Sequence, residues 1–269
     1  MSITRILSAI VLIAVVGGTI WWLPPVATAM LAAVVSGLAA IELGLLVKPL
    51  GARVPQQAIV FGAAATTLAV SAAMSFQPFE PEAALVMLLG FLVLTGSIAL
   101  TFTPGMPVFL SLSVMMLAVM YVGVPLGTLA WVRVIHGPAA LTWLVGVIAI
   151  SDSAQYYVGT LMGRQKLAPV ISPKKTIEGA IGGLVAAPLA GWAIGLWALP
   201  GRAPAAVAGV AALLTVAGMV GDLFESLLKR SVGVKDSSKL IPGHGGVLDR
   251  VDAYLFAAPV FYVYLRYLA

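Results

Sequence analysis

Long apolar segments follow one another along most of the chain, and they constrain the fold more than any other feature of the sequence. A helix needs about 20 mostly apolar residues to cross the hydrocarbon core of a bilayer. Segments of this kind, separated by short polar or proline- and glycine-bearing breaks, occur at 6–23, 26–47, 57–76, 83–102, 107–130, 138–161, 177–198, 204–228 and 251–268. The sequence therefore predicts an all-α polytopic membrane protein with about nine transmembrane helices.

The composition excludes other classes of protein. Hydrophobic residues make up 61% of the 269 residues, and charged residues make up 9%. A soluble domain is about 45–50% apolar and about 25% charged, so this chain has too few charged groups to cover a water-exposed surface. Disordered chains are poor in hydrophobic residues, which excludes that class as well. Because the chain has no cysteine, disulfides, thiolate metal sites and cysteine nucleophiles are also excluded.

The basic residues predict the orientation in the membrane, because cytoplasmic loops carry an excess of lysine and arginine. If the spans alternate, the side that holds the N-terminus receives every basic residue except Arg133, Arg202 and Arg266. This bias predicts a cytoplasmic N-terminus and an external C-terminus. An alternative is that the first span is a signal peptide cleaved near Ala27-Thr28-Ala29, but Arg5 is the only basic residue before it and the apolar run is long for a signal peptide.

The charged residues are concentrated in the second half of the chain. Of the 10 acidic residues, only Glu42, Glu80 and Glu82 precede position 150. The first half is instead rich in small and apolar residues, which let membrane helices pack closely. We therefore expect residues 1–135 to form a scaffold of transmembrane helices and residues 136–269 to form a catalytic region with a cytoplasm-facing site, both within a single membrane-embedded unit.

Four of the acidic residues in predicted spans or at their ends lie in or beside the basic loops of the second half. Asp152 lies in the sixth span, Asp222 and Glu225 end the eighth, and Asp252 begins the ninth. An ionisable group at membrane depth costs about 2.5–3.5 kcal/mol on insertion scales, and such residues are usually functional. A structural alternative is that Asp222 and Glu225 mark the point where the helix leaves the membrane, with Lys229 as a surface partner of Glu225. Four such acids beside basic loops favour the functional interpretation.

The spacing of these acids predicts a metal site. The positions i, i+3, i+4 and i+7 share one helix face, and they are occupied by Asp222, Glu225, Ser226 and Lys229. Asp249 and Asp252, three residues apart, would also share a face if the ninth helix begins early. Hard carboxylate oxygens favour Mg²⁺ over a soft metal, and Mg²⁺ is usually held by one or two carboxylates together with substrate phosphates. A structural ion-pair network would have a similar pattern.

Two segments near these acids have features of a phosphate-binding site. Segment 171–179 places Ser172, Lys174, Lys175 and Thr176 before a helix, whose N-terminus offers free backbone N–H groups and the positive end of the helix dipole. Thr176 is the predicted N-cap of that helix. The alternative is a solvated basic loop with an ordinary cap. Segment 242–246, Pro-Gly-His-Gly-Gly, lets the backbone approach a ligand closely, and its His244 could be a general base, a phosphate ligand or a turn residue.

These features together predict a cytoplasm-facing intramembrane site for Mg²⁺ and a polyphosphate. Nucleic acid is not expected as a partner, because the basic residues flank membrane helices and form no separate domain. A serine hydrolase is not expected, because no nucleophile elbow is present. A cation-coupled transporter is an alternative, since transporters also keep intramembrane acids. Transporters usually have broken helices at matching positions in two halves, whereas the charge here is confined to one half.

The charged segments resemble a known family. The pattern Ser226-x-x-Lys229-Arg230-x4-Lys235-Asp236, continued by Pro-Gly-His-Gly-Gly-Val-Leu-Asp-Arg-Val-Asp at 242–252, is similar to the signature of the phosphatidate cytidylyltransferases, or CDP-diglyceride synthases. The preceding segment 221–225 and the stretch from Asp152 to Gly179 also resemble that family. The resemblance is specific over roughly 150–255 and only hydropathic before it. Gln155 departs from the family pattern, which more often has small residues before the tyrosine.

The resemblance implies a reaction in which CMP is transferred from CTP to phosphatidic acid, giving CDP-diacylglycerol and pyrophosphate. It also implies a multi-pass protein of the inner (cytoplasmic) membrane, a homodimer, and Mg²⁺ as the cofactor, with a second, monovalent cation such as K⁺ beside it. The lipid partner is less defined, because residues that bind phosphate do not distinguish lipid tails. Another lipid phosphate as the acceptor is therefore a close alternative.

The resemblance also implies roles for individual residues. Asp222 and Asp249 are the expected Mg²⁺ ligands, with Asp252 and Glu225 next to the metal or at a second cation. The residues expected to act in catalysis are Asp222, Asp249, Lys229, Arg230, His244 and Arg250. The residues expected to bind substrate are Asp152, Ser172, Lys174, Lys175, Thr176, Glu178, Ser226, Lys235, Asp236, Gly245 and Gly246.

Overall fold

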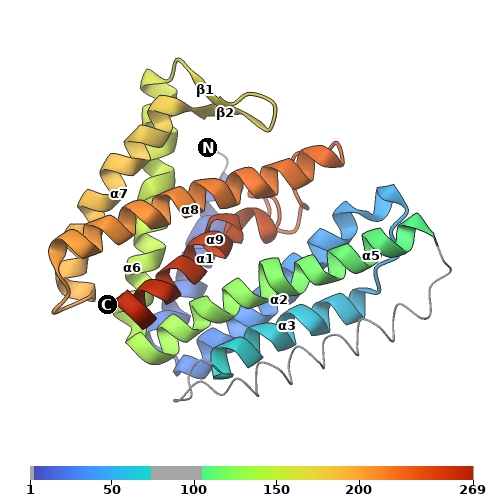
Figure 1. Ribbon diagram of the computed structural model, residues 1–269, viewed down its shortest axis with the longest axis horizontal. Coiled ribbons are helices and arrows are strands. Elements are labelled where there is room, and N and C mark those ends of the chain that lie inside the picture. Colours follow the sequence, from blue (N-terminus) through green and yellow to red (C-terminus); the bar gives the residue numbers. More distant parts are fainter. Residues whose placement is uncertain (1–2, 74–104, 269) are drawn as a thin grey trace. The chain divides into compact units, whose positions relative to one another are not determined.

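The computed structural model describes residues 3–73 and 105–268, and most of them are helical (Figure 1). The fourth predicted span, 83–102, lies outside the described residues. In chain order the elements are α1 (Ile3–Trp21), α2 (Pro25–Leu46), the 3-10 turn η1 (Lys48–Leu50), α3 (Gln56–Ala73), α5 (Met106–Leu117), the π-helical segment η2 (Ala118–Gly123), α6 (Val124–Met162), β1 (Lys166–Ala168), β2 (Ser172–Thr176), α7 (Ile177–Ala198), α8 (Pro204–Ser231), α9 (Leu248–Val263) and the π-helical segment η3 (Tyr264–Leu268).

Several helices meet the length and composition needed to cross a bilayer. Within the described residues there are 5 of them: Pro25–Leu50, Gln56–Ala73, Pro107–Met162, Ile177–Ala198 and Pro204–Ser231. They coincide with predicted spans, which confirms a helical membrane protein; the number nine and the orientation stay predictions. The stretch Pro107–Met162 covers two predicted spans, and its backbone departs from helical geometry at Gly137, with φ 81° and ψ −177°. Pro138 follows and has no N–H to donate to the helix.

The chain divides into two compact units, and each is described here by itself. The first unit comprises Met1–Ile135 and Val232–Arg250. In this unit α2 packs beside α3, and α3 packs beside η2 (Figure 1). Glycine makes the second of these contacts possible, because a Cβ added at Gly123 of η2 would lie 2.9 Å from the Ala63 carbonyl oxygen of α3. Small residues that let backbones approach in this way are the usual means of packing helices in lipid.

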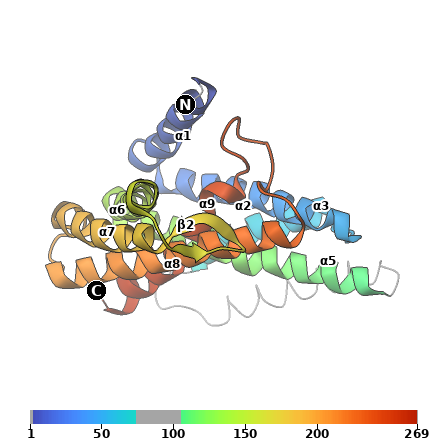
Figure 2. The same cartoon turned by 90° about the horizontal axis from the view of Figure 1, so that it is seen from above.

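The second unit comprises His136–Ser231 and Val251–Ala269. Here α7 and α8 lie side by side (Figure 2). A Cβ at Gly191 would lie 2.6 Å from the Cβ of Ala211, so the two helices can approach this closely only at a glycine. Trp143 is fully buried beside them: its indole stacks on Phe261 with 5.0 Å between ring centroids, and its Nε1–H donates to the carbonyl oxygen of Gly191 over 2.7 Å.

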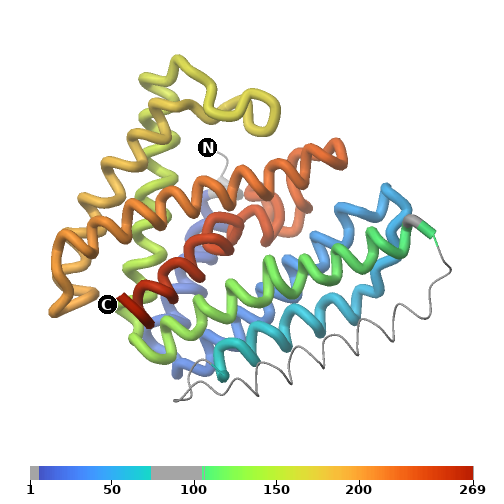
Figure 3. The backbone as a smooth tube through the Cα atoms, viewed as in Figure 1, coloured from blue at the N-terminus to red at the C-terminus, as the bar shows by residue number. Residues whose placement is uncertain are grey.

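A two-stranded sheet joins α6 to α7, which the expectation of an all-α protein did not include. Strands β1 and β2 are antiparallel, with Lys166 opposite Thr176 and Ala168 opposite Ser172. Figure 3 shows the backbone folding back on itself between the two helices. The Ile177 N–H also donates to the Gln165 carbonyl oxygen over 2.9 Å. The basic segment before α7 is therefore an ordered hairpin whose second strand runs directly into the helix.

Candidate functional site

The N-terminus of α7 is built as its sequence predicts. Thr176 has an extended backbone, with φ −126° and ψ 154°, and its hydroxyl accepts a hydrogen bond from the Gly179 N–H over 3.2 Å. The prediction of Thr176 as the N-cap is thus confirmed. The Glu178 carboxylate accepts the N–H groups of Arg164 and Gln165 over 3.0 and 3.2 Å. These contacts attach the first residues of the hairpin to the first turn of α7, a structural role that the sequence did not indicate.

The hairpin and α8 meet through an ion pair. The ammonium nitrogen of Lys175 lies 2.6 Å from Oδ2 of Asp222, and the two side chains are 19% and 37% exposed. Oδ1 of Asp222 accepts the hydroxyl of Ser226 over 3.3 Å. At the end of α8, Nε of Arg230 donates to the Ile171 carbonyl oxygen over 3.3 Å. The predicted phosphate-binding hairpin therefore lies against the predicted metal-binding helix.

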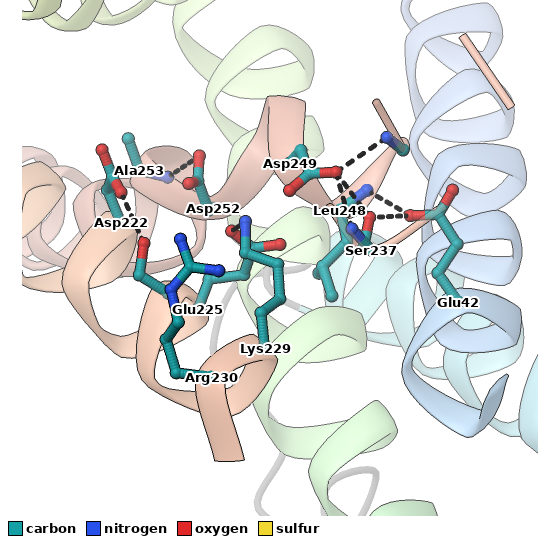
Figure 4. A network of polar contacts seen from close by, with 12 residues as sticks. Glu42, Asp222, Glu225, Lys229, Arg230, Ser237, Leu248, Asp249, Asp252 and Ala253 are labelled. Atoms are coloured by element: carbon teal, nitrogen blue, oxygen red, sulfur yellow. Dashed lines mark hydrogen bonds and ion pairs between the residues drawn. The ribbon is translucent and has the colours of Figure 1, made fainter. Parts of the chain in front are cut away.

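The next turn of α8 carries a second ion pair, which is buried. The carboxylate of Glu225 is inaccessible to solvent and accepts the ammonium of Lys229, four residues later (Figure 4). The predicted shared face of α8 is confirmed by this pair and by the bond between Ser226 and Asp222. The structural alternative placed the Glu225–Lys229 pair at the surface, whereas the pair is inside the protein. Burial of two charges is tolerated only when they satisfy each other, so each residue holds the other in place.

Asp252 and Asp152 are two more carboxylates of the second unit whose charges influence each other. Asp252 lies one turn into α9, close enough to Asp222, Asp152 and Lys229 for their charges to act on it. Its Oδ1 accepts the Ala253 N–H over 2.8 Å (Figure 4). A Cβ at Gly221 would lie 2.4 Å from the Asp252 carbonyl oxygen, so glycine is what lets α8 and α9 approach here. The second unit therefore carries carboxylates on α6, α8 and α9.

Gln155, the departure from the family pattern, lies in this group. Its side-chain nitrogen donates to the Ser151 hydroxyl over 2.9 Å and to Oδ1 of Asp152 over 3.4 Å. Asp152 is itself solvent-exposed. An amide that donates to a carboxylate limits where that carboxylate can turn, so Gln155 orients Asp152.

The segment between α8 and α9 belongs to the first unit and forms a compact loop. The Ile241 N–H donates to the Gly245 carbonyl oxygen over 2.8 Å, and the His244 N–H donates to the Ile241 carbonyl oxygen over 2.9 Å. Gly243 and Gly245 have φ values of 77° and 83°, a region that favours glycine. The ring of His244 contacts the Ser8 hydroxyl through Nδ1 over 2.8 Å. His244 is thus held against α1 by a polar contact.

Asp249 is held by this loop through a single carboxylate oxygen. Its Oδ2 accepts the Ser237 N–H over 2.9 Å, the Ser237 hydroxyl over 2.8 Å and the Gly246 N–H over 2.7 Å (Figure 4). Three hydrogen bonds on one oxygen fix the rotation of the carboxylate. Of the other predicted residues of the loop, Gly246 is buried and Gly245 is half-buried, whereas Lys235, Asp236 and Arg250 are exposed to solvent.

Sequence reasoning missed the residue that anchors this loop. Glu42 is 2% exposed in the apolar helix α2, and its carboxylate accepts four hydrogen bonds from residues 237–248. The signal was present, because an acid within an apolar span is as costly at position 42 as at position 152. Charge density does not single out Glu42, because charged residues are sparse in the first half of the chain.

The donor set is chemically suited to Mg²⁺. Within residues 3–73 and 105–268, no three acidic or histidine side chains converge as a site made only of protein ligands would require. Mg²⁺ does not need such a site, because it keeps waters and is usually held by one or two carboxylates plus substrate phosphates. Within the second unit Asp222 and Asp252 carry hard oxygen donors, and within the first unit Asp249 does. Glu225 contacts the Lys229 ammonium, so its role at a metal stays a prediction.

The comparisons with known proteins agree with these observations. A family model described as "Cytidylyltransferase family" matches residues 3–268. The chain is 44% identical over 135 residues to the "Uncharacterized protein YnbB" of Escherichia coli (strain K12), covering 49% of this chain and 45% of that protein. It is 42% identical over 139 residues to a phosphatidate cytidylyltransferase of Helicobacter pylori (strain ATCC 700392 / 26695), covering 52% of each. It is also 42% identical over 127 residues to one of Staphylococcus aureus (strain COL), covering 44% and 46%. The matched region thus spans about half the length of these curated relatives.

Proposed function

The chain belongs to the cytidylyltransferase family, and we propose that it transfers CMP from CTP to phosphatidic acid, forming CDP-diacylglycerol and pyrophosphate. Relatives named phosphatidate cytidylyltransferase support the choice of lipid. The family match favours nucleotidyl transfer over the alternative of a cation-coupled transporter. Transfer to another lipid phosphate stays the close alternative, because the polar contacts described above distinguish headgroups and not tails.

One observation carries the proposal beyond the family match: the ion pair between Lys175 and Asp222. It joins a cationic side chain from a hairpin at a helix N-terminus to a carboxylate at the end of a transmembrane helix. A phosphate-binding group and a metal-binding group have to be neighbours wherever a metal bridges to a triphosphate. Both side chains are accessible to solvent, so a triphosphate can reach them from the water phase.

The reaction depends on positioning the two substrates and on neutralising the charge of their phosphates more than on proton transfer. The phosphate monoester of phosphatidic acid is mostly dianionic near pH 7, since its second pKa is about 6. One of its oxygens forms a bond to the α-phosphorus of CTP, while the bond from that phosphorus to the bridging oxygen breaks and pyrophosphate leaves with the electron pair. Basic side chains neutralise the charge spread over the phosphate oxygens. We assign this work to Lys175, Lys229 and Arg230 of the second unit, and to Arg250 of the first.

We assign the metal to Asp222 and Asp249, with Asp252 and Glu225 as the acids next to the metal or at a second, monovalent cation such as K⁺. Mg²⁺, when bound, supplies neutralisation of the triphosphate and of the leaving pyrophosphate. The protein's part is to hold the carboxylates in a set orientation. Three donors on Oδ2 of Asp249, and Ser226 and Lys175 on Asp222, support that part of the assignment.

The membrane arrangement follows from the same reasoning. We propose nine spans with the N-terminus in the cytoplasm, where CTP is present, and a homodimer in the inner membrane. The positions of lysine and arginine support this orientation, because all of them except Arg133, Arg202 and Arg266 fall on one side. A site near the inner face of the bilayer lets the lipid enter from the membrane while the nucleotide enters from water.

The proposal is tested with the purified full-length protein in detergent micelles that contain phosphatidic acid. CTP labelled at the α-phosphate should yield a labelled lipid that migrates as CDP-diacylglycerol, with one pyrophosphate released per lipid formed. Turnover should require Mg²⁺ and stop with a chelator. Parallel reactions with dCTP, with ATP and with a polyprenyl phosphate acceptor define the nucleotide and the lipid.

A control preparation is needed so that inactivity can be interpreted. Circular dichroism and a cooperative thermal transition establish that the protein in each assay is folded. Folded protein that transfers no label from CTP with phosphatidic acid and Mg²⁺ present would contradict the proposal. Transfer to the polyprenyl phosphate and not to phosphatidic acid would support cytidylyl transfer but contradict phosphatidic acid as the acceptor.

A further inference from the structure

Glu42 is a buried carboxylate of the first unit that accepts four hydrogen bonds. It lies in α2, is 2% exposed, and uses both of its oxygens. Oε1 accepts the Ser238 hydroxyl over 2.7 Å and the Val247 N–H over 2.9 Å. Oε2 accepts the Leu248 N–H over 2.8 Å and lies 2.8 Å from the Ser237 hydroxyl, whose one hydrogen it shares with Asp249. All four donors come from the loop between α8 and α9, about 200 residues further along the chain.

The donors around Glu42 are suited to a buried carboxylate anion. A buried carboxylate without partners is strongly unfavourable, and four hydrogen bonds compensate for the water that it loses. Two of the donors are N–H groups at the start of α9, which have no partner within that helix and lie at the positive end of its dipole. Gly246 passes so close that a Cβ there would lie 2.3 Å from Oε2 of Glu42. The loop backbone is therefore built around this carboxylate.

Ser237 connects Glu42 to Asp249. Its Oγ lies 2.8 Å from Oε2 of Glu42 and 2.8 Å from Oδ2 of Asp249, and its N–H also donates to Asp249 (Figure 4). Gly246, which is packed against Glu42, donates its N–H to the same oxygen of Asp249. Ser237 and Gly246, both next to Glu42, thus supply hydrogen bonds that orient Asp249.

We infer that Glu42 is a positioning residue for the cytidylyl transfer: it sets the loop between α8 and α9 so that Asp249 presents its carboxylate to the metal and triphosphate. This inference rests on the proposed function. Glu42 touches neither substrate nor metal; it acts through Ser237 and Gly246. Partners that orient a metal-binding carboxylate typically change metal affinity or activity about 10–100-fold when they are removed.

The main test is the substitution Glu42→Gln, which keeps the size of the side chain but replaces one acceptor oxygen by a donor. Hydrogen–deuterium exchange resolved to single amides is measured on the full-length protein in detergent, without substrate. Exchange should accelerate at Val247 and Leu248, which donate to Glu42. It should also accelerate at Ser237 and Gly246, whose amide N–H groups donate to Asp249. Acceleration confined to Val247 and Leu248 would overturn the inference.

The second readout is the Mg²⁺ concentration that gives half-maximal turnover, which should rise about 10–100-fold in Glu42→Gln. Ser237→Ala, which leaves three of the four bonds to Glu42, should raise it in the same direction if Glu42→Gln does not fold. The matched control is Ser111→Ala, because Ser111 is a buried serine of the same unit whose hydroxyl accepts the Arg53 N–H. Its Mg²⁺ dependence should equal that of the wild type.

The outcomes separate this inference from the proposed function. Folded Glu42→Gln and Ser237→Ala with unchanged Mg²⁺ dependence would overturn the positioning role while the activity stands. If the wild type has no turnover, the proposed function fails. The exchange rates at Ser237 and Gly246 still decide whether Glu42 controls the surroundings of Asp249, because they are measured without substrate.

Discussion

The ion pair between Lys175 and Asp222 allows a sharp test of the site, because its expected contribution to stability is small whereas the expected contribution of Lys175 to catalysis is large. The substitution Lys175→Met removes the charge and keeps most of the apolar stem. The two side chains are 19% and 37% exposed, so water and salt screen the pair. Partly exposed pairs contribute about 0–1 kcal/mol to stability, and Asp222 is accessible enough for water to solvate it once its partner is gone. The thermal midpoint should therefore fall by no more than about 4 °C.

The effect on catalysis should be much larger if Lys175 binds a phosphate. A hydrogen bond to a charged group contributes about 1.5–3 kcal/mol. Since each 1.36 kcal/mol is a factor of ten in rate, kcat/KM for CTP should fall about 10- to 150-fold. The assay is the initial rate of label transfer from CTP at fixed phosphatidic acid in micelles, with the thermal midpoint measured on the same preparation.

The matched control is Lys166→Met. Lys166 is an exposed lysine of the same hairpin and has no predicted role in binding. It should leave both kcat/KM and the thermal midpoint close to the wild-type values. Two results would refute the reasoning: wild-type kcat/KM in Lys175→Met, or an equal loss of activity in both variants. The second result would mean that the hairpin's overall charge matters and not the position of Lys175.

Three further predictions follow from separate parts of the molecule. Asp249→Asn should abolish turnover at saturating Mg²⁺ while the protein still unfolds cooperatively; a near-normal rate would show that Asp249 is not a metal ligand. Thr176→Ala removes the acceptor for the Gly179 N–H and should destabilise the protein by about 1 kcal/mol, whereas Thr176→Ser should not, as measured by thermal unfolding. Because the chain has no cysteine, Lys239→Cys and Arg202→Cys allow the topology to be tested in intact cells. An impermeant thiol reagent should label Arg202→Cys from outside and leave Lys239→Cys unlabelled; the reverse pattern would invert the proposed orientation.

The interactions that the sequence predicted correctly are those between neighbours along the chain. Thr176 caps α7, and Glu225 and Lys229 pair across one turn of α8, because helix geometry brings positions three and four residues apart together whatever surrounds the helix. The apolar spans are predictable for a similar reason, since the length needed to cross lipid can be counted directly.

The two-stranded hairpin shows where local patterns were insufficient. The sequence predicts phosphate-binding residues in segment 171–179 but no strands, because three- and five-residue strands are too short for a clear alternation of apolar and polar positions. The structure instead makes it an ordered element, held to α7 by Glu178. A carboxylate predicted to bind substrate thus has a contact that only the fold of the hairpin creates.

The sequence by itself determined that this chain is a helical membrane protein, which of its segments carry charge, and which residues share a helix face. Hydrophobicity and helical periodicity are properties of short stretches, so they can be read without knowing how the helices pack. Only the tertiary structure decided that Lys175 meets Asp222, and that Glu42 in α2 holds a loop about 200 residues away. Such contacts depend on how glycine-lined helices approach one another, and the position of a buried acceptor relative to its donors is settled only when those helices have packed.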